Sequence, residues 1–198
     1  MRPTLFAPLA LLVLLAGCAQ QPVQPVDDWE THRRTASELE HWQLSGKVGA
    51  RLPENSGSAR LRWNQNDSDY RIDLSGPFGQ GRVVIEALDG RVQLREGGEP
   101  PVEAATGEEL MRRATGWSFP VEQLKYWVRG IPAPGSKHHL VEFTPEGLLK
   151  TLRQSGWTLS YDDYEATGLT PLPGRIIAER NDIRLTLIVY QWSLPEAS

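Results

Sequence analysis

The sequence predicts a mainly β fold with a few helices, in which a long antiparallel sheet curls toward a barrel and helices lie across its open end. Three observations support this. Apolar and polar residues alternate through many successive short runs, and turn residues such as Asp89-Gly90 separate several of them. Two short helical segments interrupt the runs midway along the chain.

The chain begins with an export signal. Arg2 precedes an apolar run from Leu9 to Leu15. This run is shorter than the roughly 20 residues that a membrane-spanning helix needs. We therefore expect residues 1–17 to be a signal peptide that is removed.

Cys18 is the only cysteine and follows directly. The segment Leu15-Ala16-Gly17-Cys18 resembles the bacterial lipobox, which implies cleavage before Cys18 and attachment of acyl chains to it. Several acyl chains hold a protein on a bilayer far more firmly than one. Residues 18–27 are expected to form the acylated N-terminus and a flexible tether, and residues 28–198 a single domain.

The first half of the domain is expected to contain one helix and then a meander of five or six strands. Asp28 is a suitable N-cap for a helix that carries Trp29, Ala36 and Leu39, with Trp42 at its end, on one apolar side. Period-two alternation then predicts strands at 42–52, 58–65, 70–74, 82–88 and 91–97.

The second half is expected to hold two helices and four strands. Thr106 and Glu109 have capping-box spacing for a helix over 106–117, and Pro120 precedes a helix over 121–130. In the latter, Val121, Leu124, Trp127 and Val128 share an apolar face, while Glu122, Gln123, Lys125 and Arg129 are expected to face water. After a loop over 131–139, strands are expected at 148–154, 157–164, 174–181 and 183–192.

Charge and motifs exclude several classes of function. The net charge of −4 and the absence of a basic motif argue against nucleic acid. His138 and His139 are adjacent in a loop, which predicts solvated side chains rather than a metal site. Asp162 and Asp163 leave an acid pair open by spacing, although solvated strand-end charges explain them better. We expect no catalytic residue, no metal and no cofactor.

The glycine-rich turn from Leu74 to Arg82 carries an unusual residue at its tip. Gly76, Pro77 and Gly79 suit a tight turn, but Phe78 is large and apolar where turn tips are usually polar. Turn chemistry alone does not explain this side chain, and one interpretation is a plug folded back onto the sheet.

Three segments carry a resemblance to a known family. Gly116 to Pro134, GWSFPVEQLKYWVRGIPAP, resembles the GxxxPxxxLxxWxxGxP stretch of the LolB family of outer-membrane lipoprotein receptors. Arg60 to Glu86 resembles the family's W-x-Q, Y-R-x-x-L and N-P-L-G region. Leu148 to Tyr164 resembles its Q-x-G-W-x-x-x-Y segment. The resemblance covers nearly the whole mature chain.

The resemblance implies an incomplete, strongly curved antiparallel β-barrel with a helical lid over a hydrophobic cavity. It implies a monomeric, periplasm-facing outer-membrane receptor that accepts acylated lipoproteins from the soluble carrier LolA and inserts them into the inner leaflet. An exposed leucine acts in membrane insertion in this family. Phe78 occupies the matching position here, and Gly76 replaces an asparagine. The alternative is a structural lipoprotein whose core is filled.

If a cavity is present, strand alternation and the apolar helix face predict which residues line it or its lid. These are Val48, Leu61, Trp63, Ile72, Leu74, Leu124, Trp127, Leu159 and Leu187.

Overall fold

The computed structural model describes residues 23, 25–26, 28–54, 56–76, 81–115 and 120–195. The first half of the chain forms a helix and six strands. In order they are α1 (Trp29–Ser37), β1 (His41–Arg51), β2 (Ser56–Asn66), β3 (Asp69–Ser75), β4 (Val83–Leu88), β5 (Arg91–Glu96) and β6 (Val102–Ala104).

Two helices and the remaining strands follow. They are α2 (Gly107–Thr115), α3 (Val121–Trp127), β7 (His138–Phe143), β8 (Leu149–Gln154), β9 (Trp157–Asp162), β10 (Glu165–Ala166), β11 (Pro171–Leu172), β12 (Arg175–Arg180) and β13 (Ile183–Ser193).

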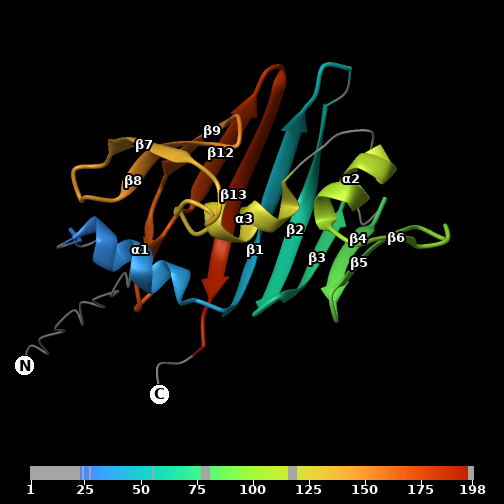
Figure 1. Ribbon diagram of the computed structural model, residues 1–198, viewed down its shortest axis with the longest axis horizontal. Helices are drawn as coiled ribbons and strands as arrows, with labels where there is room; N and C mark the ends of the chain where they lie inside the picture. The colour runs from blue at the N-terminus through green and yellow to red at the C-terminus, as the bar shows by residue number, and fades with distance from the viewer. Residues whose placement is uncertain are drawn as a thin grey trace, which may run out of the picture.

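A single antiparallel sheet dominates the structure. Its eleven strands have the order β6-β5-β4-β3-β2-β1-β13-β12-β9-β8-β7, and β10 and β11 form a separate small ribbon. In the described part of the chain β6 and β7 remain unpaired edges, so the sheet does not close. Figure 1 shows α3 and α2 lying across one face of the sheet. The expected incomplete, curved barrel with a helical lid is confirmed.

Local signals in the sequence explain several of these elements. The carboxylate of Asp28 accepts from the Thr31 backbone N–H at 3.1 Å and caps α1. The hydroxyl of Thr106 accepts from the Glu109 N–H at 3.2 Å and caps α2. Asp89 and Gly90 both have positive φ, of 52° and 74°, as the tight turn between β4 and β5 requires.

Several elements differ from expectation: α3 ends at Trp127 instead of residue 130, and the short strands β10 and β11 were not expected. The first helix ends at Ser37, and Trp42 lies on β1, where it pairs with Gln65 of β2 and is buried. The loop expected over 131–139 ends earlier, because His138 begins strand β7. This edge strand is exposed at all but one position, so its sequence has no inward-facing alternation that could predict it.

The N-terminal segment meets the domain before the first helix begins. The Val26 N–H donates to the carbonyl oxygen of Glu146 at 2.9 Å, in the turn between β7 and β8. The last residues of the expected tether therefore lie against this end of the sheet.

Candidate functional site

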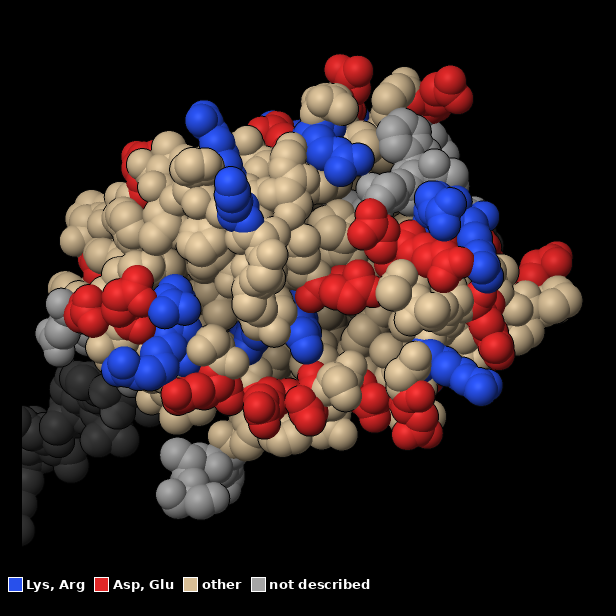
Figure 2. All heavy atoms as spheres, in the orientation of Figure 1, with Lys and Arg blue, Asp and Glu red and all other residues tan. Residues whose placement is uncertain are grey.

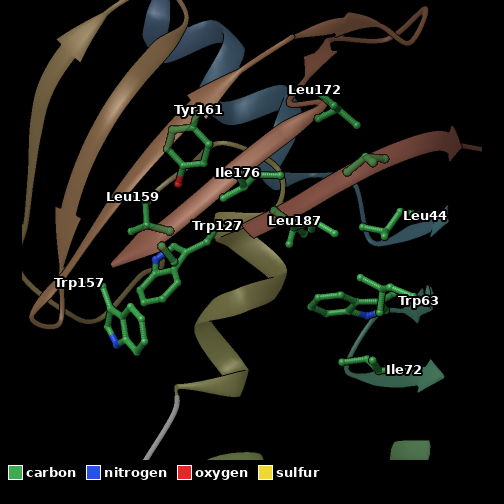
Figure 3. Close-up of a cluster of buried hydrophobic side chains, with 14 of the residues drawn as sticks. Leu44, Trp63, Ile72, Trp127, Trp157, Leu159, Tyr161, Leu172, Ile176 and Leu187 are labelled. Carbon is green, nitrogen blue, oxygen red and sulfur yellow. The ribbon is translucent and has the colours of Figure 1, made fainter. Parts of the chain in front are cut away.

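A cavity of about 180 Å³ lies between the inner face of the sheet and the two lid helices. Figure 3 shows Trp63 and Ile72 on one side of the helix that carries Trp127, and Leu159 on the other, with Leu187 between that helix and Trp63 in this view. The lining consists entirely of apolar residue types. It comprises Val48, Leu61, Trp63, Ile72, Leu74, Ile85, Met111, Val121, Leu124, Trp127, Val128, Leu159, Ile176, Ala178, Leu185 and Leu187.

All nine residues expected to line a cavity or lid do line this one. Their part in holding a ligand stays a prediction. The sequence-based list omitted seven others, namely Ile85, Met111, Val121, Val128, Ile176, Ala178 and Leu185. Period-two alternation in β4, β12 and β13 would have found four of them, and Val121 and Val128 share the apolar helix face already recognised. Met111 lies on α2 and belongs to neither of these two patterns.

The two tryptophans of the lining turn their polar atoms away from the space. The indole N–H of Trp63 donates to Oε1 of Gln65 at 3.0 Å. The indole N–H of Trp127 donates to Oε1 of Gln154 at 2.8 Å. Because both donors are satisfied elsewhere, the rings present only carbon to the cavity, which suits a hydrocarbon ligand and disfavours water.

Gln154 of β8 fixes the segment that follows α3. Besides accepting from Trp127, its Oε1 accepts from the Ala133 N–H at 2.9 Å. Its Nε2 donates to the Ala133 carbonyl at 2.7 Å and to the hydroxyl of Ser136 at 2.8 Å. This buried amide therefore ties the C-terminal end of the lid to the sheet.

Arg129, which was expected to face water, is buried instead. Its Nη1 donates to the carbonyl oxygen of Ala36 at 2.7 Å, in the last turn of α1, and to that of Leu39 at 2.8 Å, just after the helix. Its Nε donates to the carbonyl of Lys125 at 2.7 Å. Burial lowers the pKa of the guanidinium to about 10, so it stays charged at neutral pH. The expectation failed because carbonyl groups distant in sequence replace water around the cation.

The start of α3 is bound to α2 rather than to the sheet. The Gly107 N–H donates to the Glu122 carboxylate at 2.5 Å. A Cβ at Gly107 would lie 2.7 Å from Cβ of Val121, so only glycine allows this approach. The two helices form one lid, which Gln154 and Arg129 hold at its C-terminal end.

Several expected site residues lie outside the described part of the chain. These are Cys18, Pro77, Phe78 and Gly79. Gly76 is described and directly follows β3, half-buried. The insertion role of this turn and the acylation of Cys18 therefore stay predictions.

The remaining titratable groups form no second site in the described ranges. Asp162 and Asp163 are exposed. Within those same ranges, His, Cys, Asp and Glu nowhere gather in threes suited to a metal ion, and no helix is long and apolar enough to cross a membrane.

The chain is similar to known proteins over most of its length. A family model described as "Outer membrane lipoprotein LolB" matches residues 40–192. The outer-membrane lipoprotein LolB of Cellvibrio japonicus is 42% identical over 193 residues, covering 94% of this chain and 95% of that protein. The LolB of Pseudomonas paraeruginosa is 38% identical over 199 residues, covering 97% of each chain.

A solved structure supports the same fold. The crystal structure of a LolA superfamily protein from Nitrosomonas europaea matches with a TM-score of 0.56 at 10% identity. The match covers 85% of this chain and 94% of that one.

Proposed function

Since the chain belongs to the LolB family of outer-membrane lipoproteins, we propose that it is a lipid-anchored receptor of the outer membrane, facing the periplasm. It accepts acylated lipoproteins from the soluble carrier LolA and inserts them into the inner leaflet. The apolar cavity beneath the helical lid carries this proposal, because acyl chains need a dry space lined by hydrocarbon. The same observation disfavours the structural lipoprotein with a filled core.

The cavity must enlarge to hold its cargo. Its volume of about 180 Å³ falls short of the roughly 300–1,000 Å³ typical of small-molecule sites. Gln154 and Arg129 fix the lid at its C-terminal end, whereas its other end consists of α2 and the first turn of α3. We infer that α2 and the start of α3 move outward when acyl chains enter.

Transfer to the receptor needs no chemical step. A carrier gives up its cargo when the acceptor binds the acyl chains more tightly, and a preference of only about 1.4 kcal/mol shifts the exchange tenfold. The apolar lining supplies binding energy without any reacting group. The protein acts as a monomer, without catalysis or cofactor.

The membrane step involves the two segments outside the described residues. Residues 1–17 direct export, and Cys18 carries the acyl chains that hold the mature protein on the membrane. The turn that contains Phe78 enters the acyl region of the bilayer, where full burial of such a side chain contributes about 1.5–3 kcal/mol. Acceptance of cargo and its insertion are thus separate functions of separate surfaces.

A transfer assay tests the proposal. The mature chain from residue 18, with Cys18→Ala, is mixed with LolA loaded with a labelled lipoprotein, and co-purification follows the label. Vesicles are then added to measure insertion. We expect the protein with Phe78 unchanged to accept the labelled lipoprotein and to insert it into vesicles. The Phe78→Glu protein should accept the lipoprotein equally but fail to insert it, because a carboxylate resists burial in the acyl region.

Leu88→Glu is the matched control, because Leu88 is also apolar, is 58% exposed and lies beside a turn of the same meander. It should accept and insert normally. If no lipoprotein is transferred to the protein with Phe78 unchanged, the structural lipoprotein is favoured. If the Phe78→Glu protein inserts cargo equally well, the turn has no separate role in insertion.

A further inference from the structure

The outer face of the sheet, opposite the cavity, is rich in cations. Inward residues of β2, β1, β13 and β12, such as Leu61 and Leu187, line the cavity, so their sequence neighbours point outward. Along the described length of these strands the outward charged residues include one carboxylate, Glu179. The cations are Lys47, Arg51, Arg60, Arg62, Arg175 and Arg184.

Four of the outward residues form a row across neighbouring strands. Arg60 of β2 lies opposite Lys47 of β1, Lys47 opposite Ile188 of β13, and Ile188 opposite Arg175 of β12. Adjacent strands are about 4.8 Å apart, so the row spans about 15 Å. We call these four residues the outer cationic patch. All four are exposed, and Ile188 keeps 41% of its surface accessible.

The patch costs the fold free energy that no internal partner recovers. Like charges directly opposite in a sheet are destabilising, and Lys47 faces Arg60 in this way. Among the described residues, the three cations of the patch form no ion pair, although Asp162 lies opposite Arg175 on β9. By contrast, Arg71, Arg82 and Arg95 nearby are all paired with Asp73 or Glu86.

Many acidic residues of the protein lie on the opposite, helix-covered side (Figure 2). Figure 2 shows the helix-covered side, where Asp and Glu gather along the lower edge. A molecule with net charge −4 that keeps unpaired cations together on the opposite face of its sheet has a directed charge distribution. An anionic surface would attract that face and repel the other.

We propose that the outer cationic patch docks on the anionic headgroups of a lipid bilayer. Clustered Lys and Arg bind anionic lipid surfaces, and tyrosine is favoured at membrane interfaces. Tyr190, 63% exposed, lies two residues from Ile188 on β13. Arg60 also pairs with Ser75, the last residue of β3, where the chain leaves the sheet toward the turn that contains Phe78. The described end of β3 that leads to this turn therefore lies beside the patch.

Sedimentation with vesicles tests the patch without cargo or carrier, so its outcome is independent of the proposed transfer function. The mature chain from residue 18, with Cys18→Ala, is spun with phosphatidylcholine vesicles with or without phosphatidylglycerol. We expect binding that requires the anionic lipid and weakens as salt rises from about 0.05 to 0.2 M. Replacing Lys47, Arg60 and Arg175 by Gln should weaken it on the order of 100-fold.

A second triple variant controls for overall charge. Arg91, Lys137 and Arg153 are exposed cations outside the patch, again one lysine and two arginines, and their change to Gln alters net charge equally. It should bind within about threefold of the unmodified protein if the effect is local. The patch variant should melt at the same or a higher temperature, because the repulsion between Lys47 and Arg60 is gone.

Equal loss of vesicle binding in both triple variants, or none in either, would overturn the proposal. So would a patch variant that binds vesicles normally but no longer accepts labelled lipoprotein from the carrier in vesicle-free solution. That result would assign the patch to an acidic protein partner.

Discussion

Replacing Arg129 by Met should separate the lid from the N-terminal helix. The guanidinium donates to the carbonyls of Ala36 and Leu39 at the end of α1 and to that of Lys125 in α3. Methionine has similar length and fills the same space, but it donates no hydrogen bond. The carbonyl oxygens would then be left without this partner.

The expected loss of stability follows from two opposing contributions. Hydrogen bonds from a charged group contribute about 1.5–3 kcal/mol each. Against this, burial lowers the pKa of Arg129 from 12.5 to about 10, which corresponds to a desolvation cost of about 3 kcal/mol that methionine avoids. Three lost bonds, less the avoided desolvation cost, therefore leave a net destabilisation of about 1.5–6 kcal/mol. For a domain of this size, the melting temperature should fall by at least about 3 °C.

Denaturant unfolding measures this change, with Arg153→Met as the control, because Arg153 is exposed on β8. The control should stay within about 0.5 kcal/mol of the unmodified protein. Hydrogen exchange should also quicken at the end of α1. An Arg129→Met protein as stable as the control would refute the view that this residue joins the lid to the first helix.

Three further changes test other parts of the structure. Burial lowers the pKa of His32 to about 4 against 6.5 when exposed, so the unfolded state binds the extra proton. The free energy of unfolding should thus fall by up to about 3 kcal/mol as pH drops from 6.5 to 4. In the His32→Gln protein, the free energy of unfolding measured in urea should vary less with pH over this range. Ala178→Leu should fill part of the cavity, reducing uptake of a fluorescent fatty acid while stability changes by less than about 1.5 kcal/mol; unchanged uptake would contradict the assigned cavity. Cys18→Ala in the full chain should move the protein from membranes to the soluble fraction once high salt has removed binding through the outer cationic patch, and continued sedimentation with salt-washed membranes would argue against the lipid anchor.

The strands of the sheet could be predicted because their inner faces are apolar. In β2, Leu61, Trp63 and Gln65 are buried while their neighbours are exposed, which is the period that the sequence displays. The same period and the helix face of α3 identified all nine expected lining residues. β7 could not be predicted, because a strand exposed on both faces has no apolar alternation.

The ties between distant segments could not be predicted in the same way. Arg129 lies on what the helical period marks as a polar face, and its carbonyl partners Ala36 and Leu39 lie about ninety residues earlier in the chain. Gln154 likewise gains its role only when β8 brings it beside Trp127 and Ala133. Whether the apolar residues fill a core or leave a cavity also depends on where the lid helices stop, which period alone does not specify.

The place of β13 in the sheet has a consequence for how the chain folds. This last strand in the sequence lies at the centre, between β1 and β12. The strands on either side can pair locally as they emerge, but the two halves can join only after the final residues are available. Contacts between such distant segments form slowly, and unjoined sheet edges invite aggregation. Loss of β13 (Ile183–Ser193) would therefore divide the sheet rather than trim its edge.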